Sequence, residues 1–371
     1  MAIAASKAGH VRQFREDDIP QVADIHRRVF QLGGQTSPEL LDAYRAWFLQ
    51  VFLSNPWRDE SVRSLVYEDH PGRVKGFLGV MPQRMVYNGQ RVKVAVMTNF
   101  VVDRDSRGVA GISLMRSLLS GPQDLAIADE ATPDVRRMWD GLGGATSLPY
   151  SIHWYYPLRP CQFAAFAAKQ KKIVPGFLVY LGTPVAQLMD AVITRFIKFP
   201  FRKSESRLSG RELDPETLAH CLSEMTHKLS LRPDSDPSRI NWILQRARQL
   251  RSNGRLRPII LTTEKGDVAG WFLYYANPGG VSQVLQLHAK VPFTGDVLDH
   301  LLKDAWQQGV TVLSGRPERD LMPALSDRHC IFSCGPAWAL IHSKKPELIN
   351  AFHRGDVFFS RLEGEWCSHF R

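Results

Sequence analysis

The chain has 371 residues, of which 44% are apolar and 23% are charged, and its formal net charge is +10. This length predicts two domains or three, and the composition excludes a collagen, a low-complexity polymer or a disordered chain. The longest apolar stretch, Ile173 to Phe201, contains Asp190, Arg195 and Lys198, so no membrane-spanning helix is expected. The opening segment MAIAASKAGHVRQF lacks an apolar core of signal-peptide length, and we therefore expect a cytoplasmic protein.

The five cysteines are scattered and odd in number, which is typical of reduced thiols rather than of a disulfide framework. Cys330 and Cys334 lie close together beside His329, but no second pair of ligands follows at a regular spacing. The sequence therefore predicts no metal site.

The positive charge is concentrated in one segment. Residues 166–210 carry 8 Lys and Arg against 2 Asp and Glu, whereas the flanking halves carry 19 against 17 and 20 against 18. This pattern predicts no nucleic-acid partner, because nucleic-acid-binding proteins spread their basic residues over a binding surface. The same segment predicts the domain organisation, with a domain over 1–165, a basic helical linker over 166–210 and a second domain over 211–371.

The first half alternates helix and strand signals. An N-terminal strand precedes two helices, the second opened by the cap pair Ser37-Pro38. A hairpin and the Asn88-Gly89 turn then lead into a strand over 92–103. A helix over 111–120, a strand over 124–128, a helix from Thr132-Pro133 and an aromatic strand over 147–158 are expected to close this half. The second half repeats the order of two helices, hairpin, strand, helix, strand, helix and strand, which predicts a tandem duplication.

The stretch TNFVVDRDSRGVAGISLMRSLL, Thr98 to Leu119, places a strand, an Asp-rich turn, an Arg-Gly loop and a helix in succession. This order resembles the acyl-CoA site of the GNAT N-acyltransferase superfamily, and MWDGLGG downstream resembles the end of a later family helix. The resemblance covers about residues 11–158. It implies an α+β fold with two GNAT-like domains in tandem, each a mixed, mostly antiparallel sheet flanked by helices.

The resemblance also implies where acetyl-CoA or another acyl-CoA would bind. A helix N-terminus offers unpaired N–H groups to the pyrophosphate, and an open strand edge pairs with the pantetheine amides. The family's R-x-x-G-x-G/A pattern has alanine and isoleucine at two expected small positions here. The implied cofactor-binding residues are Phe100, Val101, Val102, Arg107, Gly108, Val109, Ala110, Gly111 and Ile112. The equivalent place in the second half, Val291 to Asp296, has one glycine, no arginine and an acid, so we expect that half to shape the acceptor pocket instead.

Acyl transfer to an amine requires a base, an oxyanion donor and a proton for the leaving thiolate. Many members of the family place a carboxylate on the central strand, where this chain has Thr98 and Asn99. The nearest candidate bases are Asp129 and Glu130, with Glu130 preferred for its reach. Both could instead only stabilise the helix that follows.

The family's thiolate-protonating tyrosine falls on Trp139, whose indole is a donor but not a practical acid. Tyr150 is the first substitute, followed by Tyr155 and Tyr156. The expected oxyanion donor is a backbone N–H near Phe100 or Val101.

Three functions remain open from the sequence. The first is an N-acyltransferase that moves an acetyl or longer acyl group from acyl-CoA to a small amine, such as an amino sugar or amino acid. The second is a Fem-type transferase that uses aminoacyl-tRNA. The third is a non-catalytic GNAT-like adaptor of an envelope polysaccharide pathway.

The linker predicts a helix that starts at Thr183-Pro184 and carries an apolar face with a basic C-terminal end. The apolar face comprises Val185, Leu188, Met189, Val192, Phe196 and Ile197. Residues 183–203 could pack between the halves, or could contact an anionic membrane peripherally.

Overall fold

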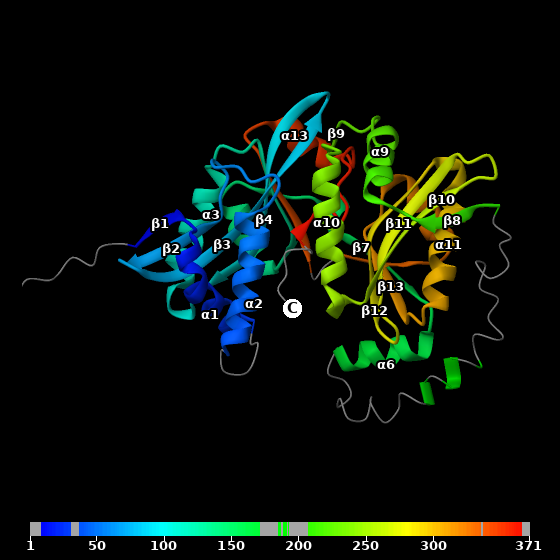
Figure 1. Ribbon diagram of the computed structural model, residues 1–371, viewed down its shortest axis with the longest axis horizontal. Coiled ribbons are helices and arrows are strands. Elements are labelled where there is room, and N and C mark those ends of the chain that lie inside the picture. The colour runs from blue at the N-terminus through cyan, green and yellow to red at the C-terminus, as the bar shows by residue number, and fades with distance from the viewer. Residues whose placement is uncertain are drawn as a thin grey trace, which may run out of the picture.

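The computed structural model describes residues 9–30, 37–170, 185–186, 188–190, 192, 207–334 and 337–365. Figure 1 shows two sheets on either side of helix α10 (Pro237–Gln249). The strands before the linker are β1 (His10–Gln13), β2 (Leu65–His70), β3 (Arg73–Tyr87), β4 (Gln90–Val102), β5 (Leu125–Ala131), β6 (Ala145–Thr146) and β7 (Ile152–Pro157). The helices of this part are α1 (Ile19–Val29), α2 (Pro38–Phe48), α3 (Arg107–Leu119), α4 (Pro133–Gly141), α5 (Leu148–Ser151) and α6 (Pro160–Gln170).

The part after the linker is built from the same kinds of element. Its strands are β8 (Ser209–Glu212), β9 (Leu231–Pro233), β10 (Arg255–Thr262), β11 (Val268–Ala276), β12 (Val281–Ala289), β13 (Val312–Gly315), β14 (Ile331–Cys334) and β15 (Trp338–His342). Its helices, besides α10, are α9 (Pro215–Met225), α11 (Thr294–Gln307), α12 (Met322–Asp327) and α13 (Pro346–His353).

Several predicted element ends are confirmed, because they rest on local chemistry. The Ser37 side chain accepts the Leu40 N–H at the start of α2, and Thr132 accepts the Val135 N–H at the start of α4. Asn88 and Gly89, with φ of 47° and 84°, make the tight turn between β3 and β4. Two successive residues with positive φ match the right-handed twist of a hairpin.

The two sheets have matching strand orders, which confirms the predicted α+β architecture of two mixed, mostly antiparallel sheets. The first runs β1-β2-β3-β4-β5-β15-β6, with β9 added at β3, and the second runs β14-β7-β13-β12-β11-β10-β8. The one parallel pairing recorded in each is β4 with β5 and β12 with β13, at equivalent places.

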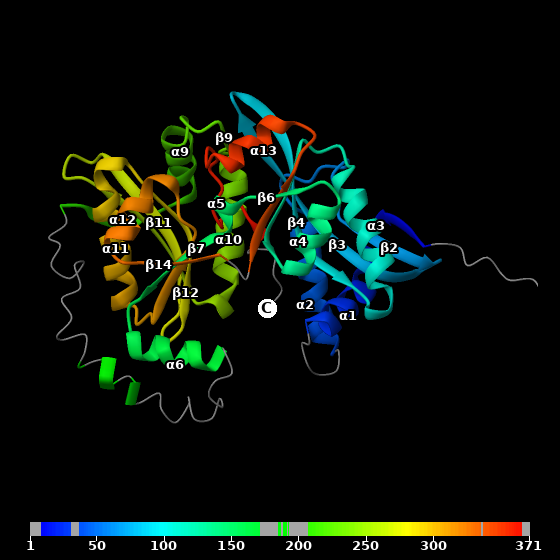
Figure 2. The same ribbon diagram turned by 180° about the vertical axis from the view of Figure 1, so that it is seen from behind.

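The halves exchange a strand. β7 pairs with β13 and β14 in the second sheet, and β15 pairs with β5 and β6 in the first (Figure 2). The expectation that 147–158 closes the first half is therefore wrong: this stretch forms α5 and then a strand of the other sheet. The boundaries proposed at 165 and 211 stay a prediction, but the sheets are not built from those ranges alone.

The residues after α13 pass between the two halves, and we call 354–365 the C-terminal segment. On one side the Tyr150 hydroxyl donates to the Val357 carbonyl, and Gln83 donates to the Glu363 carbonyl. On the other side the Leu362 N–H donates to the Leu285 carbonyl over 3.1 Å.

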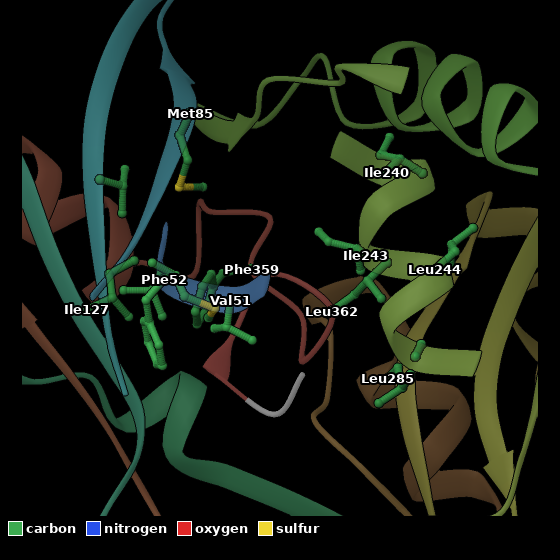
Figure 3. Close-up of a cluster of buried hydrophobic side chains, with 14 of the residues drawn as sticks. Val51, Phe52, Met85, Ile127, Ile240, Ile243, Leu244, Leu285, Phe359 and Leu362 are labelled. Carbon is green, nitrogen blue, oxygen red and sulfur yellow. The ribbon is translucent and has the colours of Figure 1, made fainter. Parts of the chain in front are cut away.

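Apolar side chains from both halves enclose the C-terminal segment. Figure 3 shows Phe359 and Leu362 between side chains of the first half, such as Phe52 and Ile127, and Ile243 of α10. Phe359, Leu362 and Ile127 are buried members of one cluster that spans the two halves. The segment is therefore a structural part of the interface.

The linker lies largely outside the described residues. Of its predicted helix, Val185, Leu188, Met189 and Val192 are described, and all four side chains are exposed. They do not pack between the halves. No described helix is both long and apolar enough to cross a membrane.

Candidate functional site

The candidate site lies where β4 and β5 separate. Their recorded pairing runs from Val94 with Leu125 to Val96 with Ile127. Beyond that point β5 continues with β15 on its other edge, while β4 continues along β3. Two parallel strands that diverge expose backbone N–H and C=O groups to a ligand between them.

A bulge marks the divergence on β4. Its register to β3 shifts between the pairs Gly79–Thr98 and Phe77–Val101, and Asn99 has a φ of 47°. The Asn99 side chain is held by His26, whose Nε2 lies 3.3 Å from its Oδ1, and it donates to the Thr98 hydroxyl over 3.0 Å. Thr98 and Asn99 are both buried. This bulge re-aims the strand just before the predicted oxyanion donors at Phe100 and Val101.

The predicted cofactor loop is helical. Residues 107–112 form the first turns of α3, preceded by a 3₁₀ turn over Arg104–Ser106, so the expectation of a separate loop is wrong. Ala110 and Ile112 stand where the family has small residues, and both accept helical geometry readily. Gly108 has no positive φ, and a Cβ there would meet open space. Backbone strain therefore does not explain the glycine at this position.

The predicted cofactor residues divide between the surface and the core. Arg107, Gly108, Val109 and Ile112 are exposed, and Phe100 is half-buried. Val101, Val102, Ala110 and Gly111 are buried. The exposed first turn of α3 leaves its N–H groups accessible to an anion, as pyrophosphate binding requires. A cavity of about 290 Å³ adjoins this turn and is lined by Arg28, Val29, Asp103 and Arg104.

The equivalent helix of the second half is already covered. The Arg328 guanidinium donates to the Gly295 carbonyl over 2.9 Å and to the Asp299 carboxylate over 2.6 Å. It lies 3.2 Å from where a Gly295 Cβ would be. The first turn of α11 therefore differs from that of α3, which carries no such side chain over Gly108.

Both carboxylate oxygens of Asp129 contact other residues of the protein. Its side chain is 0% exposed, and its Oδ2 lies 3.0 Å from Nη1 of the buried Arg316. Its Oδ1 accepts the Glu365 N–H over 2.8 Å. Arg316 also donates to the Asp129 carbonyl. Asp129 thus ties β5 to the second half and to the C-terminal segment, which is a positioning role.

Glu130 is the more accessible of the two predicted carboxylates. Its side chain is 22% exposed, and its Oε1 lies 3.8 Å from Nη1 of the buried Arg361. Part of the Glu130 side chain therefore remains exposed beside Arg361, and its role as a base stays a prediction.

A third carboxyl group, from Glu365, was not anticipated. Its Oε1 accepts the Glu130 N–H over 2.9 Å, and Thr98 provides a side-chain hydrogen bond to it. Glu365 therefore bridges β4 and β5 at the point of divergence. Burial and the neighbouring Asp129 and Glu130 carboxylates raise the pKa of Glu365 well above its usual range.

The predicted acid candidates have structural partners. The Tyr150 hydroxyl donates to the Val357 carbonyl, and burial raises its pKa. Tyr150 therefore holds the C-terminal segment rather than reaching Asp129 or Glu130. The Trp139 indole donates to the Ile341 carbonyl over 3.0 Å. Tyr156 is buried, and burial raises its pKa to about 12.

His153 lies near Arg361 and Arg316, the arginines that face Glu130 and Asp129. Its Nδ1 lies 2.9 Å from Arg361 Nη2, and burial, with the charges of Arg361 and Arg316, lowers its pKa to about 3. The folded protein therefore holds this histidine neutral.

This histidine predicts an acid-sensitive fold. Since the unfolded chain binds the proton near pH 6.5, stability from neutral His153 is complete above that pH and falls as the pH drops towards 3. By pH 4 the loss from this group is about 3 kcal/mol. Urea unfolding of wild type and His153→Gln at pH 7 and pH 4 measures it: the variant is expected to lose about 3 kcal/mol less over this range. Equal losses would contradict the assignment.

The sequence and the structure were compared with those of known proteins. No family model matches the sequence, and no curated protein matches it. Solved structures do match over nearly the whole chain. A structure from Enterococcus faecalis described as a "Probable N-Acyltransferase" aligns with a TM-score of 0.57 and 10% identity, covering 90% of this chain and 72% of the other.

Two further structures agree. A GCN5-related N-acetyltransferase from Kribbella flavida aligns with a TM-score of 0.53 and 13% identity, covering 92% of this chain and 72% of that one. The chain has the GNAT fold. Saccharomyces cerevisiae N-myristoyltransferase with bound myristoyl-CoA aligns over 92% of this chain and 84% of its own, with a TM-score of 0.52 and 10% identity. The GNAT fold thus extends over both halves, whereas the sequence likeness covered only the first.

Within the described residues, no group of three or more His, Cys, Asp and Glu side chains is arranged to hold a metal ion. Beyond the recorded pairing of β4 and β5, the carboxyl groups of Glu130 and Glu365 lie near the backbone N–H groups of these strands. This arrangement can accept a proton and stabilise an oxyanion.

Proposed function

We propose that the protein is an N-acyltransferase that moves an acetyl or longer acyl group from acyl-CoA to the amine of a small acceptor. The observation that carries this proposal is the divergence of β4 and β5, with the exposed first turn of α3 at one side and the carboxyl groups of Glu130 and Glu365 between the strands. The two features supply a place for the cofactor phosphates and a base within one opening.

The reaction assigns a role to each part. An alkylamine with a pKa of roughly 10 is protonated at neutral pH and must lose a proton before attack. We assign that proton to Glu365 or Glu130, directly or through water. The amine nitrogen then bonds the thioester carbon, and a β4 N–H near Phe100 or Val101 stabilises the oxyanion. The C–S bond breaks as the amide forms, and the leaving thiolate takes up the second proton that the nitrogen loses, directly or through water.

A direct test uses thiol release. Purified protein is incubated with acetyl-CoA and a panel of amines, amino sugars and amino acids, and free CoA thiol is measured. Release that depends on the amine supports the proposal. Acetyl-CoA binding by calorimetry without release for any amine favours the adaptor, and binding of aminoacyl-tRNA instead of acetyl-CoA favours the Fem-type transferase.

The cofactor site predicts a specific loss of affinity. Arg107→Glu at the exposed start of α3 is expected to weaken acetyl-CoA binding about 10-fold or more, since a carboxylate there repels phosphate. Gly108→Val is expected to do the same by covering the helix N-terminus. Thr294→Glu, at the equivalent position of α11, serves as the control and is expected to leave binding unchanged. The opposite ranking in calorimetry would place the cofactor in the second half.

We also propose peripheral contact of the linker with an anionic membrane. Val185, Leu188, Met189 and Val192 are spaced as one helix face, and their exposed fractions are 59%, 67%, 49% and 51%. The surrounding residues 166–210 carry a net charge of +6, and each basic residue near an anionic surface contributes about 1 kcal/mol.

Sedimentation with vesicles tests this contact. Binding to phosphatidylglycerol vesicles, but not to phosphatidylcholine vesicles, is expected, and 0.5 M salt (about a 4 Å screening length) should weaken it. Leu188→Glu should reduce binding, whereas Leu148→Glu, an equally exposed apolar residue outside the linker, should not. Salt-insensitive or absent sedimentation would contradict the proposal.

A further inference from the structure

The second half contains a cavity of about 880 Å³ at its own strand divergence. The recorded pairing of β12 with β13 ends at Gln283 and Ser314. The cavity begins directly after it, lined by Val284 to His288 on β12 and by Arg316 to Asp320 after β13. Its volume is within the range of sites that enclose drug-sized organic ligands.

The cavity has an apolar wall. This wall is lined by Leu285 and Leu287 of β12 and by Phe358 of the C-terminal segment. All three residues are buried from bulk solvent. A ligand that fills this space therefore needs a carbon body.

One inner polar group of the cavity, His288, is held on three sides; Gln286, Arg316, Glu318, Ser360 and Arg361 also line the cavity. The His288 ring lies between Trp271 and Phe358, with ring centroids 4.9 Å and 5.5 Å away. Its Nδ1 lies 2.7 Å from the Glu318 carboxylate. No hydrogen bond to its Nε2 is recorded among the residues that the structure describes, and its side chain is 11% exposed. With Nδ1 directed at Glu318, Nε2 is the ring nitrogen that remains to form a hydrogen bond with a ligand.

The outer lining of the cavity is cationic. Lys228, Arg319 and Arg354 are exposed lining residues, and none forms an ion pair within the described part of the chain. Two acids accompany them: Asp320 is exposed, while Asp356 accepts hydrogen bonds from Ser230. The cations therefore exceed the acids among the outer lining residues.

We propose that this cavity binds an organic carboxylate that has an apolar carbon body and a hydrogen-bonding group at its far end. The carboxylate lies at Lys228, Arg319 and Arg354, the carbon body packs on Phe358 and Leu285, and the hydrogen-bonding group reaches His288 Nε2. The inference goes beyond the proposed acyl transfer, because this binding can be measured without acyl-CoA and its failure leaves that function untouched.

Calorimetry with three matched probes tests the charge preference. 4-Phenylbutyrate, 4-phenylbutylamine and 4-phenylbutanol share one carbon body and differ in the end group. We expect 4-phenylbutyrate to bind about 10-fold more tightly than the other two, and Lys228→Gln or Arg354→Gln to remove most of this difference without changing the affinity for the alcohol. Arg251→Gln, an exposed arginine outside the cavity, should change nothing. Equal or tighter binding of the amine, or no binding of 4-phenylbutyrate at millimolar concentration, would overturn the proposal.

Two variants locate the probe. Leu229→Trp adds volume at a half-buried lining residue and should abolish binding of 4-phenylbutyrate while thermal unfolding is unchanged. Addition of a para-hydroxyl, in 4-(4-hydroxyphenyl)butyrate, should tighten binding about 3-fold or more in wild type and not in His288→Phe, which keeps the aromatic stack and removes the ring nitrogen. Binding that survives Leu229→Trp, or a hydroxyl gain that survives His288→Phe, would place the probe elsewhere and contradict the proposal.

Discussion

Glu365→Gln is expected to lower the turnover number about 100-fold or more while the affinity for acyl-CoA is unchanged. Glu365 bridges Thr98 of β4 and the Glu130 N–H of β5, so its carboxyl group lies in the opening where the amine would attack. Glutamine preserves its size and one hydrogen-bond acceptor but cannot take a proton. The measurement is steady-state release of CoA thiol with the acceptor found in the amine panel.

The pH dependence of turnover distinguishes this base from others. A base must be ionised to act, so activity rises with pH through its pKa. Burial and the negative charges of Asp129 and Glu130 raise the pKa of Glu365. The acidic limb of the profile should therefore lie well above about pH 4.3, which is the ordinary pKa of a glutamate side chain. This limb should be lost in Glu365→Gln.

Glu130→Gln is the matched comparison, because the Glu130 N–H donates to Glu365 and the Glu130 side chain is 22% exposed. Loss of the acidic limb in Glu130→Gln alone would make Glu130 the base, as the sequence predicts. Full activity in both variants would show that the amine binds already neutral and needs no carboxylate.

Arg316→Met is expected to lower the free energy of unfolding by about 3 to 5 kcal/mol. The Arg316 and Asp129 side chains are 5% and 0% exposed and lie 3.0 Å apart, so removal of the arginine leaves an uncompensated buried carboxylate. Urea unfolding at pH 7 measures the loss.

The double variant Arg316→Met with Asp129→Asn separates the ion pair from simple packing. Its loss of unfolding free energy should be smaller than the sum of the losses in the two single variants. The reason is that Asp129→Asn removes the buried negative charge that Arg316→Met leaves without a counter-charge. Additive losses would show that Asp129 and Arg316 act independently. The sequence predicts Asp129 either as a candidate base or as a residue that stabilises the following helix, and the second role would give additivity.

The parts of the fold that were predicted correctly rest on local chemistry. The caps at Ser37 and Thr132, the turn at Asn88-Gly89 and the repeated element order need only neighbouring residues to be recognised. The choice of strand partner does not. Residues 152–157 and 338–342 are both short strands with apolar or aromatic side chains, so their pattern indicates a strand without indicating which sheet it joins.

The sequence likewise predicts some parts of the candidate site and misses others. The end of β5 was identified because a buried strand runs into Asp129 and Glu130, and the divergence of β4 followed from the family resemblance. Glu365 was missed because it is 235 residues away from Glu130, and nothing in the run Glu363-Gly364-Glu365 indicates that it folds back between the halves. The helical start at Arg107 was missed because the family pattern suggested glycines where Ala110 and Ile112 stand.

The strand exchange between the halves has a consequence for synthesis on the ribosome. β6 pairs with β15 and not with β5, so the first sheet has a gap until residue 342 has emerged. At about 5–20 residues per second, roughly 10 to 40 s separate the synthesis of β5 from that of β15. During this interval the open edge of β5 is available to other strands, which makes the nascent chain a natural client for chaperones. A fragment that ends before β15 keeps that open edge of β5, and the two halves therefore fold as one unit.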